Sequence, residues 1–240
     1  MPVTSFWLEP TDRAEVGLRR YQQGESPCPR EGGKWRYHGA LAVLGDAPIA
    51  WSAERPAGCS HWFTDGEDRY GAPEFTYPGH DDPRWPARCE CGYEFTAEDA
   101  WQEWVDRLYR RADNGGLVRL GDAPPGAMWD AHWNGRKGPD GRCLTVKCPN
   151  GDEWTIDSRA TNCTMPDDSE HRCWSRHGEP PAITVDKDGL TCAAGAGSIQ
   201  AGTYHGFLRG GVFTLSGGCG AGSGTRRRRC RWAAVAAAAA

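Results

Sequence analysis

The sequence predicts an α+β fold that is rich in β-strand, with short hairpins, one main amphipathic helix and loops that resemble zinc knuckles. Three observations predict this class. Apolar residues make up only 38% of the 240 residues, and twelve tryptophans replace much of the aliphatic content. Turn signals rich in Gly, Pro, Asn and Asp recur at short intervals, which is typical of strands joined by hairpins. Cysteine and histidine occur in close pairs, as they do in loops that bind a metal ion.

The N-terminal part is expected to combine short strands with one long loop. Residues 7–51 contain apolar runs that are interrupted by Gly- and Pro-containing turns, which predicts strands. Residues 52–88 are polar and show no periodicity, so they are expected to form a loop. A loop of this length in a compact domain needs a functional reason or a staple. The motifs Cys-Ser-His at 59–61 and Cys-Glu-Cys at 89–91 are placed to supply the staple.

The main helix is predicted to begin at Thr96, which can cap it, and to end at Asn114 and Gly115. Acidic residues in its first turn and arginines in its last turn complement the helix dipole. Apolar residues repeat at helical spacing, so one face is expected to pack on the core. These residues are Ala97, Trp101, Trp104, Val105, Leu108 and Ala112.

Composition predicts two structured units and a tail. A Pro- and Gly-containing segment from residue 122 is typical of a hinge, so we expect an N-terminal unit over residues 1–121 and a C-terminal Cys/His-rich hairpin unit over residues 122–216. Within the second unit, Asn150-Gly151 is the strongest hairpin signal. Residues 217–240 have low complexity and are expected to be disordered.

Charge and targeting signals restrict the classes of partner. Residues 1–225 carry 23 basic and 32 acidic side chains, a net charge of −9. Nucleic-acid binding needs cations that neutralise phosphates, so an acidic body disfavours it. The N-terminus lacks a basic region followed by an apolar run, and no stretch is apolar enough to span a membrane, so we expect a non-secreted protein. In a reducing compartment, eleven cysteines are expected to bind metal rather than form disulfides.

The first predicted metal site consists of Cys59, His61, Cys89 and Cys91. Structural zinc (Zn2+) takes four tetrahedral ligands from thiolates and imidazoles, and two close pairs brought together by a hairpin supply that set. Gly92 follows the second pair, as in knuckles whose backbone N–H groups face the sulfur. Unrelated buried thiols are the main alternative, and a catalytic role is the least favoured.

The second predicted metal site consists of Cys148, Cys163, Cys173 and His177. Cys173 and His177 have a Cx3H spacing, and a hairpin return could bring the other two cysteines to them. Four further residues are substitutes for these ligands, so the membership of this site is open. They are Cys143, His171, Cys192 and His205.

Two catalytic alternatives are weaker. Asp167, Asp168 and Glu170 are expected to be solvated turn formers, although a carboxylate can act as general base for a metal-bound water. Cys192 precedes a run of small residues and could act as a nucleophile with His205 as its base. Glycine-rich turns around buried cysteines are far commoner than cysteine catalysis, so the sequence leans against an enzyme.

Three segments resemble an uncharacterised protein family that is frequent in phages of actinobacteria. They are WTIDSRATNCTMPDDSEHRCWSRHGEPPAITVDKDGLTCAAGAGSI at 154–199, YHGFLRGGVF at 204–213 and PPGAMWDAHW at 124–133. The similarity extends over most of residues 6–215. The resemblance implies a phage origin and carries over no catalytic residue, because the family has no established activity. The tail after Ser216 departs from the family and is either a lineage-specific extension or a shifted reading frame.

Taken together, these features predict a zinc-stabilised phage accessory protein that acts in the host cytoplasm as a binding module, with a protein as partner. The alternatives are a nucleic-acid-binding zinc protein and a metal- or thiol-dependent hydrolase used in host takeover.

Overall fold

The fold is built almost wholly from β-strands. The structure, a computed structural model, describes residues 2–22, 28–29, 37–57, 61–66, 68–165, 167–168, 170–189, 191–194 and 197–216. The strands are β1 (Val3–Thr4), β2 (Phe6–Tyr21), β3 (Gly39–Ser52), β4 (Phe63–Thr64), β5 (Tyr70–Pro73), β6 (Ala100–Arg111), β7 (Leu117–Arg119), β8 (Ala127–Asp130), β9 (Leu144–Lys147), β10 (Glu153–Thr155), β11 (Ser175–His177), β12 (Thr184–Asp186), β13 (Ile199–Ala201), β14 (Tyr204–Arg209) and β15 (Val212–Leu215). The helices of this described part are two short 3-10 turns, η1 (Leu120–Asp122) and η2 (His132–Asn134). The tail predicted to be disordered, residues 217–240, lies outside the described residues.

The predicted α+β class with a main amphipathic helix is wrong. The segment that was expected to form the helix is a turn followed by β6, which pairs antiparallel with β2 from Tyr21↔Ala100 to Leu8↔Arg111. Inter-strand hydrogen bonds over this length override a local helix preference, which is a weak determinant. The long loop expected over residues 52–88 is also interrupted, because β4 and β5 form a short hairpin within it.

The predicted hairpins of the C-terminal part are confirmed. The Asn150-Gly151 turn joins β9 to β10, with Trp154 opposite Val146, and Gly151 has a φ of +87° that favours glycine. The final hairpin pairs β14 with β15, with Arg209 opposite Val212. The β-rich character expected from the turn signals is therefore correct.

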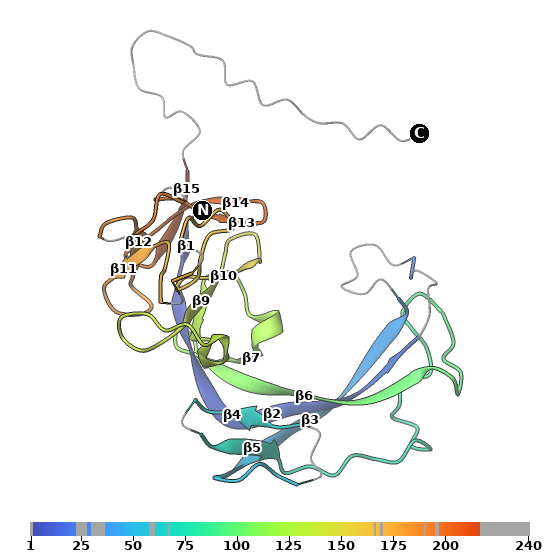
Figure 1. The fold of residues 1–240 in the computed structure, drawn as a ribbon. Helices are drawn as coiled ribbons and strands as arrows, with labels where there is room; N and C mark the ends of the chain where they lie inside the picture. The colour runs from blue at the N-terminus through green and yellow to red at the C-terminus, as the bar shows by residue number, and fades with distance from the viewer. Residues whose placement is uncertain are drawn as a thin grey trace, which may run out of the picture.

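The strands form three sheets (Figure 1). The largest has nine strands in the order β10-β9-β8-β2-β3-β5-β4, with β6 on the other side of β2 and β7 beside β6. A four-stranded sheet has the order β1-β15-β14-β13, and β11 and β12 form a pair. In Figure 1, β2, β3 and β6 run as a long curved sheet, whereas β1 and β9 to β15 gather in a compact body at its upper left.

Strand β2 connects the compact body to the long sheet. Its first residues, Phe6 and Trp7, pair in parallel with Ala127 and Met128 of β8. The remainder pairs with β3 and β6, after a register shift against β6 between Pro10 and Ala14. Such irregularities bend a strand and increase its twist. The predicted boundary after residue 121 stays a prediction, and β2 is the element that joins the strands on its two sides.

Among the described residues, the two larger apolar clusters occupy the compact body and the bend of β2, and neither extends to the far end of the long sheet. The core of the body includes Leu144, Val146 and Phe213, and a second cluster surrounds Leu8 and Trp129. At the far end, aromatic and cationic side chains pack on one another in place of aliphatic ones. These side chains are Arg20, Trp85 and Trp101. The guanidinium carbon of Arg20 lies 3.7 Å from the centre of the Trp101 ring. This end therefore needs a further source of stability.

Among the described residues, no helix has the length and apolar character that a membrane-crossing helix requires.

Candidate metal centres

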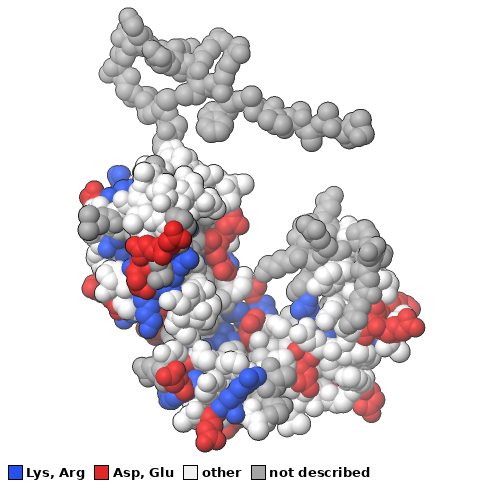
Figure 2. All heavy atoms as spheres, viewed as in Figure 1, with Lys and Arg blue, Asp and Glu red and all other residues white. Residues whose placement is uncertain are grey.

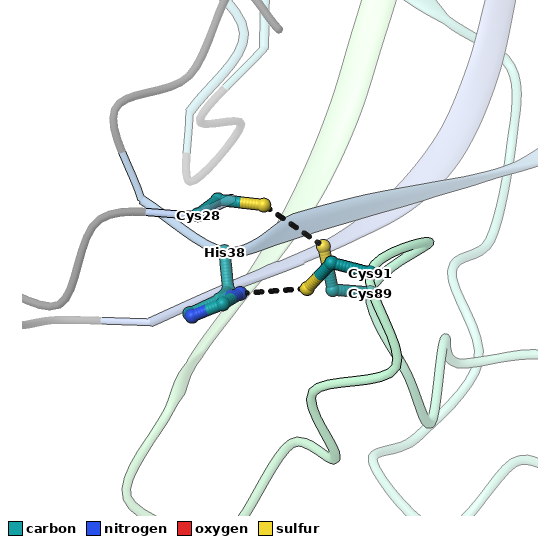
Figure 3. A group of neighbouring side chains, drawn as sticks. All are labelled: Cys28, His38, Cys89 and Cys91. Carbon is teal, nitrogen blue, oxygen red and sulfur yellow. Dashed lines mark hydrogen bonds between the residues drawn. The ribbon is translucent and has the colours of Figure 1, made fainter. Parts of the chain in front are cut away.

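Cys28, His38, Cys89 and Cys91 form the first Cys/His cluster, which we call site 1 (Figure 3). Cys28 lies between β2 and β3, His38 directly precedes β3, and the Cys89–Cys91 turn lies upstream of β6. The Sγ atoms of Cys28 and Cys89 are 3.8 Å apart, and His38 Nδ1 lies 3.0 Å from Cys91 Sγ. One ligand atom from each residue lies within 4.8 Å of the others, so site 1 could hold a metal ion.

A tight turn presents the two cysteines of the Cys-Glu-Cys motif. Cys89 N donates to Tyr93 O, and Gly92 N donates to Cys89 O. Gly92 has a φ of +94°, a left-handed conformation that favours glycine. Burial would raise the pKa of the Cys89 thiol, but backbone N–H donors from Cys91 and Gly39, with the adjacent thiol and imidazole, lower this pKa to about 6. The turn thus favours the thiolate, which is the form that binds metal.

Cys163, His171, Cys173 and Cys192 form the second cluster, site 2. The sulfur of Cys192 lies 3.5 Å from that of Cys173 and 3.9 Å from that of Cys163. His171 Nε2 lies 3.8 Å from Cys173 Sγ. As in site 1, the four ligand atoms lie within 4.8 Å of one another, so site 2 could also hold a metal ion.

Backbone N–H donors also face the sulfur atoms of site 2, but the pKa values of its thiols shift in opposite directions: burial and the neighbouring thiols of Cys192 and Cys163 raise the pKa of Cys173 to about 11. Ala160 N donates to Cys173 Sγ at 3.2 Å. Burial would raise the pKa of the Cys192 thiol, but hydrogen bonds from His171 and from backbone N–H groups, including that of Ala194, lower the pKa to about 5. Oriented N–H donors around a metal ligand are a usual part of metal sites.

The sulfur atoms converge as thiols and not as cystines. All eight described cysteines are free. The sulfur–sulfur separations within the two sites are 3.5, 3.8 and 3.9 Å, whereas a disulfide bond is about 2.05 Å long.

Of the ligands predicted for the first site, Cys89 and Cys91 lie in site 1, and their partners are Cys28 and His38. His61 is placed elsewhere, with Nε2 3.7 Å from Glu103 Oε2 and its ring 5.9 Å from that of Tyr77. Cys59 lies outside the described residues. His61 is therefore not part of site 1, whose Cys89 turn meets the start of β3, where Gly39 N–H donates to Cys89 Sγ.

Of the ligands predicted for the second site, Cys163 and Cys173 lie in site 2. Cys148 does not, because it is buried in the apolar core of the compact body, where burial raises the pKa of its thiol to about 12. His177 lies in β11, and its Nε2 is 3.1 Å from Asp186 Oδ1. Cys148 and His177 are therefore not part of site 2, because the first packs in the apolar core and the second contacts Asp186.

Of the four residues named as substitute ligands for the second predicted site, two lie in site 2 and two do not. His171 and Cys192 are ligands of site 2. Cys143 is buried elsewhere, and His205 contacts the hydroxyl groups of Ser198 and Ser216 at 3.0 Å each.

Cys28 and His38 were not identified from the sequence. Both flank the Gly-rich turn between two expected strands, in CPREGGKWRYH. Antiparallel strands joined by a turn bring their ends together, so this flanking pair was a usable signal. Its spacing is wider than the spacings that are typical of zinc loops.

The acidic residues near site 2 shape a turn. Asp168 Oδ1 accepts a hydrogen bond from Glu170 N at 3.0 Å. Within the described residues, the ligand atoms of site 2 come from cysteine and histidine alone. Asp168 thus acts as the turn former that its sequence context indicates.

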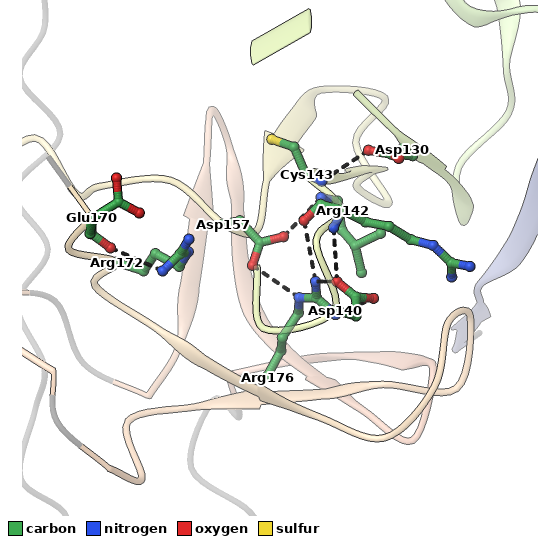
Figure 4. A network of polar contacts seen from close by, with 9 residues as sticks. Asp130, Asp140, Arg142, Cys143, Asp157, Glu170, Arg172 and Arg176 are labelled. Atoms are coloured by element: carbon green, nitrogen blue, oxygen red, sulfur yellow. Dashed lines mark hydrogen bonds and ion pairs between the residues drawn. The ribbon is translucent and has the colours of Figure 1, made fainter. Parts of the chain in front are cut away.

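A buried ion-pair network anchors β11, which lies between Cys173 and Cys192 of site 2 in the chain (Figure 4). Arg176 Nε lies 2.9 Å from Asp157 Oδ1, and the same guanidinium contacts Asp140. The side chains of Arg176 and Asp157 are 4% and 2% exposed. Asp157 Oδ2 also accepts a hydrogen bond from Leu144 N, so the network ties β11 to β9.

Comparison of the chain with protein-family models, with curated proteins and with solved structures finds no match.

Proposed function

We propose that this chain is a zinc-stapled binding protein in which sites 1 and 2 each hold one structural Zn2+. The observation that carries the proposal is the spacing of the sulfur atoms. Tetrahedral ligands at the zinc–sulfur distance of about 2.3 Å lie about 3.8 Å apart. The measured separations of 3.8 Å in site 1 and of 3.5 and 3.9 Å in site 2 match this edge length.

The donor set favours zinc and a structural role. Three thiolates and one imidazole form a closed tetrahedral set, whereas a catalytic zinc keeps one position open for water or substrate. Structural zinc contributes on the order of 10–16 kcal/mol to folding. Site 1 lies at the end of the long sheet that has little aliphatic core, which is where such a contribution is needed.

A protein is the proposed partner. Eight arginines of the described residues form ion pairs with carboxylates, which reduces the positive charge available to phosphates; they are Arg13, Arg69, Arg84, Arg88, Arg107, Arg111, Arg119 and Arg176. Figure 2 shows blue and red side chains interspersed over the visible face. Exposed apolar side chains such as Trp133 and Met165, 52% and 41% exposed, are suited to contact a protein surface.

The biological setting is proposed from the resemblance to the actinobacterial phage family. An accessory protein made in the host cytoplasm would fold under reducing conditions. The eight free thiols of the described residues suit that compartment.

Elemental analysis of the purified full chain tests the proposal. Two zinc atoms per chain are expected, and one atom per chain in each of the variants Cys89→Ser and Cys173→Ser. Metal-free protein that keeps the same circular dichroism spectrum would overturn the proposal. Titration with duplex DNA at several salt concentrations tests the nucleic-acid alternative, which requires an affinity that falls steeply with salt.

A further inference from the structure

Strand β3 has a free edge along its first half. On one side it pairs with β2 from Gly39 to Pro48, and on the other side it pairs with β5 only from Ile49 to Ser52. Within the described residues, no strand therefore lies beside residues 39–47 on the side away from β2.

The backbone groups that face this free edge can be assigned. Gln22 N donates to His38 O, so His38 directs its carbonyl toward β2. Backbone groups alternate between the two sides of an antiparallel strand. Leu41 and Val43 therefore direct their N–H and C=O groups away from β2, as Gly39 does, whose N–H reaches the sulfur of Cys89.

Residues 39–43 of the free edge lack charge and proline, two of the usual protections against strand pairing, and the bulge of β3 against β2 begins only after Val43. Natural proteins place charged residues or proline on exposed edges, since unpaired edges template the addition of another strand. Residues 39–45 read GALAVLG and contain neither. Leu41 and Val43 are 43% and 53% exposed, which is unusual for apolar side chains on such an edge.

We propose that this edge pairs with the same edge of a second copy of the chain, in antiparallel orientation about a two-fold axis at Ala42. In this register Leu41 of each copy lies opposite Val43 of the other. Both residues direct their backbone groups outward, so the two pairs form four hydrogen bonds. The long sheets of the two copies then become one continuous sheet.

The edge is complementary to itself in charge and in side chains. The paired segment itself carries no charge, and the charged residue Arg19 of β2 lies opposite Leu41, one strand away from the edge. The nearest charged side chain of β3 is Asp46, which lies beyond this segment and whose Oδ2 is 2.6 Å from Arg13 Nε. Opposed apolar side chains on one face of a sheet stabilise the pairing of strands.

An apolar strip on the same face extends the contact. Val43 and Trp104 both lie opposite Gly17, on either side of β2. A Cβ atom on Gly17 would lie 2.9 Å from a ring carbon of Trp104, so the indole covers this glycine. In the dimer, Trp104 and Val43 of one copy would continue into Leu41 of the other. An isologous contact of this kind closes with two copies.

Sedimentation velocity of the zinc-loaded full chain tests the inference. We expect a dimer, twice the 26.3 kDa of the chain, at concentrations near 50 µM. Val43→Lys places a charge on the free edge and should raise the dissociation constant by about tenfold or more. Leu41→Pro removes one outward N–H, spares the ladder with β2, and should weaken the dimer in the same direction.

The matched control is Leu117→Lys, because Leu117 is an exposed leucine of β7 with a similar exposed fraction. It should remain a dimer. A wild-type chain that stays monomeric, or a Val43→Lys variant that dimerises as well as the wild type, would overturn the inference. Zinc content and circular dichroism of the same samples separate loss of pairing from loss of metal or of fold, so the dimer can fail while the proposed function stands.

Discussion

The sulfur atoms of Cys173 and Cys192 lie 3.5 Å apart although nineteen positions separate the two residues in the sequence. Two thiols at this distance, with a third thiol and an imidazole beside them, gain stability chiefly when a cation binds them. A cation bound by these side chains would hold the segment around Cys173 and the segment around Cys192 together. Four predictions follow from this and related contacts.

The histidine of site 2 is His171 and not His177. His171→Ala should lower the metal content from two atoms per chain to about one, because the imidazole is one of four ligands. His177→Ala should keep two atoms, since His177 contacts Asp186 instead. Elemental analysis of both variants, purified in parallel, checks this pair. Equal metal contents in the two variants would contradict the assignment.

The histidine of site 1 is His38 and not His61. His38→Ala should lose one metal atom per chain and should lower the thermal midpoint, because site 1 holds the start of β3 against the Cys89 turn. His61→Ala serves as the control and should retain both atoms. Calorimetry and metal analysis of the two variants measure the effect. Loss of metal in His61→Ala alone would show that the ligand set is assigned wrongly.

Removal of Arg176 should destabilise the compact body strongly. Arg176→Met leaves the carboxylate of Asp157, 2% exposed, without its cation. Breaking a buried ion pair in this way costs about 3–5 kcal/mol in the free energy of unfolding. Arg84→Met breaks an exposed pair with Asp82 and should leave the free energy of unfolding near the wild-type value. Urea titrations of both variants provide the comparison.

Cys148 should make stability depend on alkaline pH. Burial raises the pKa of its thiol from 9.0 to about 12, so above pH 9 the unfolded chain releases a proton that the folded chain keeps. The contribution of this protonated thiol to the free energy of unfolding is fully present below pH 9 and decreases as the pH rises toward 12. At pH 10 the wild type should lose on the order of 1 kcal/mol in its free energy of unfolding, relative to neutral pH, through this group.

The matched variant for this prediction is Cys148→Ala, which has no thiol at this position. The difference in the free energy of unfolding between wild type and variant should shrink by that amount between pH 7.5 and pH 10. Other titrating groups are common to both chains and cancel in the difference. A difference that stays constant with pH would show that the thiol ionises equally in the folded and unfolded states.

Local turn chemistry was predictable from the sequence, whereas the identity of β6 was not. The Asn150-Gly151 and Gly210-Gly211 turns lie in the expected hairpins. In β6, apolar residues lie on both faces of the strand. Trp101 packs on Arg20 on one face, and Trp104 covers Gly17 on the other. Apolar residues on both faces obscure the alternation of a strand and imitate the period of a helix.

The capping hydrogen bonds that were expected at Thr96 are present, but they belong to the turn that precedes β6 and not to a helix. Asp99 Oδ2 accepts a hydrogen bond from Thr96 N at 2.7 Å, and Thr96 Oγ1 accepts one from Glu98 N at 3.3 Å. The same bonds between side chain and backbone occur at helix starts and in turns, so they do not distinguish the two. Only the pairing of β6 with β2 decides that the residues after this turn form a strand and not a helix.

Close pairs of metal ligands were predictable, and their distant partners were not. Cys89 with Cys91, and Cys163 with Cys173, each lie together as expected. The other two members of each site depend on which chain segments meet in space. For site 1 this is set by the β2–β3 connection: Cys28 and His38 flank it, but their spacing is wider than the spacings that are typical of zinc loops.

The pairing of β1 with β15, in which Val3 lies opposite Phe213, has a consequence during translation. A nascent chain presents its first strand to solvent until about 210 further residues have been made, which takes about 10–40 s at the usual speed of a ribosome. The four-stranded sheet can therefore close only after β15 has been made. The release of residues 212–215 from the exit tunnel is the earliest moment at which the molecule reaches its final topology.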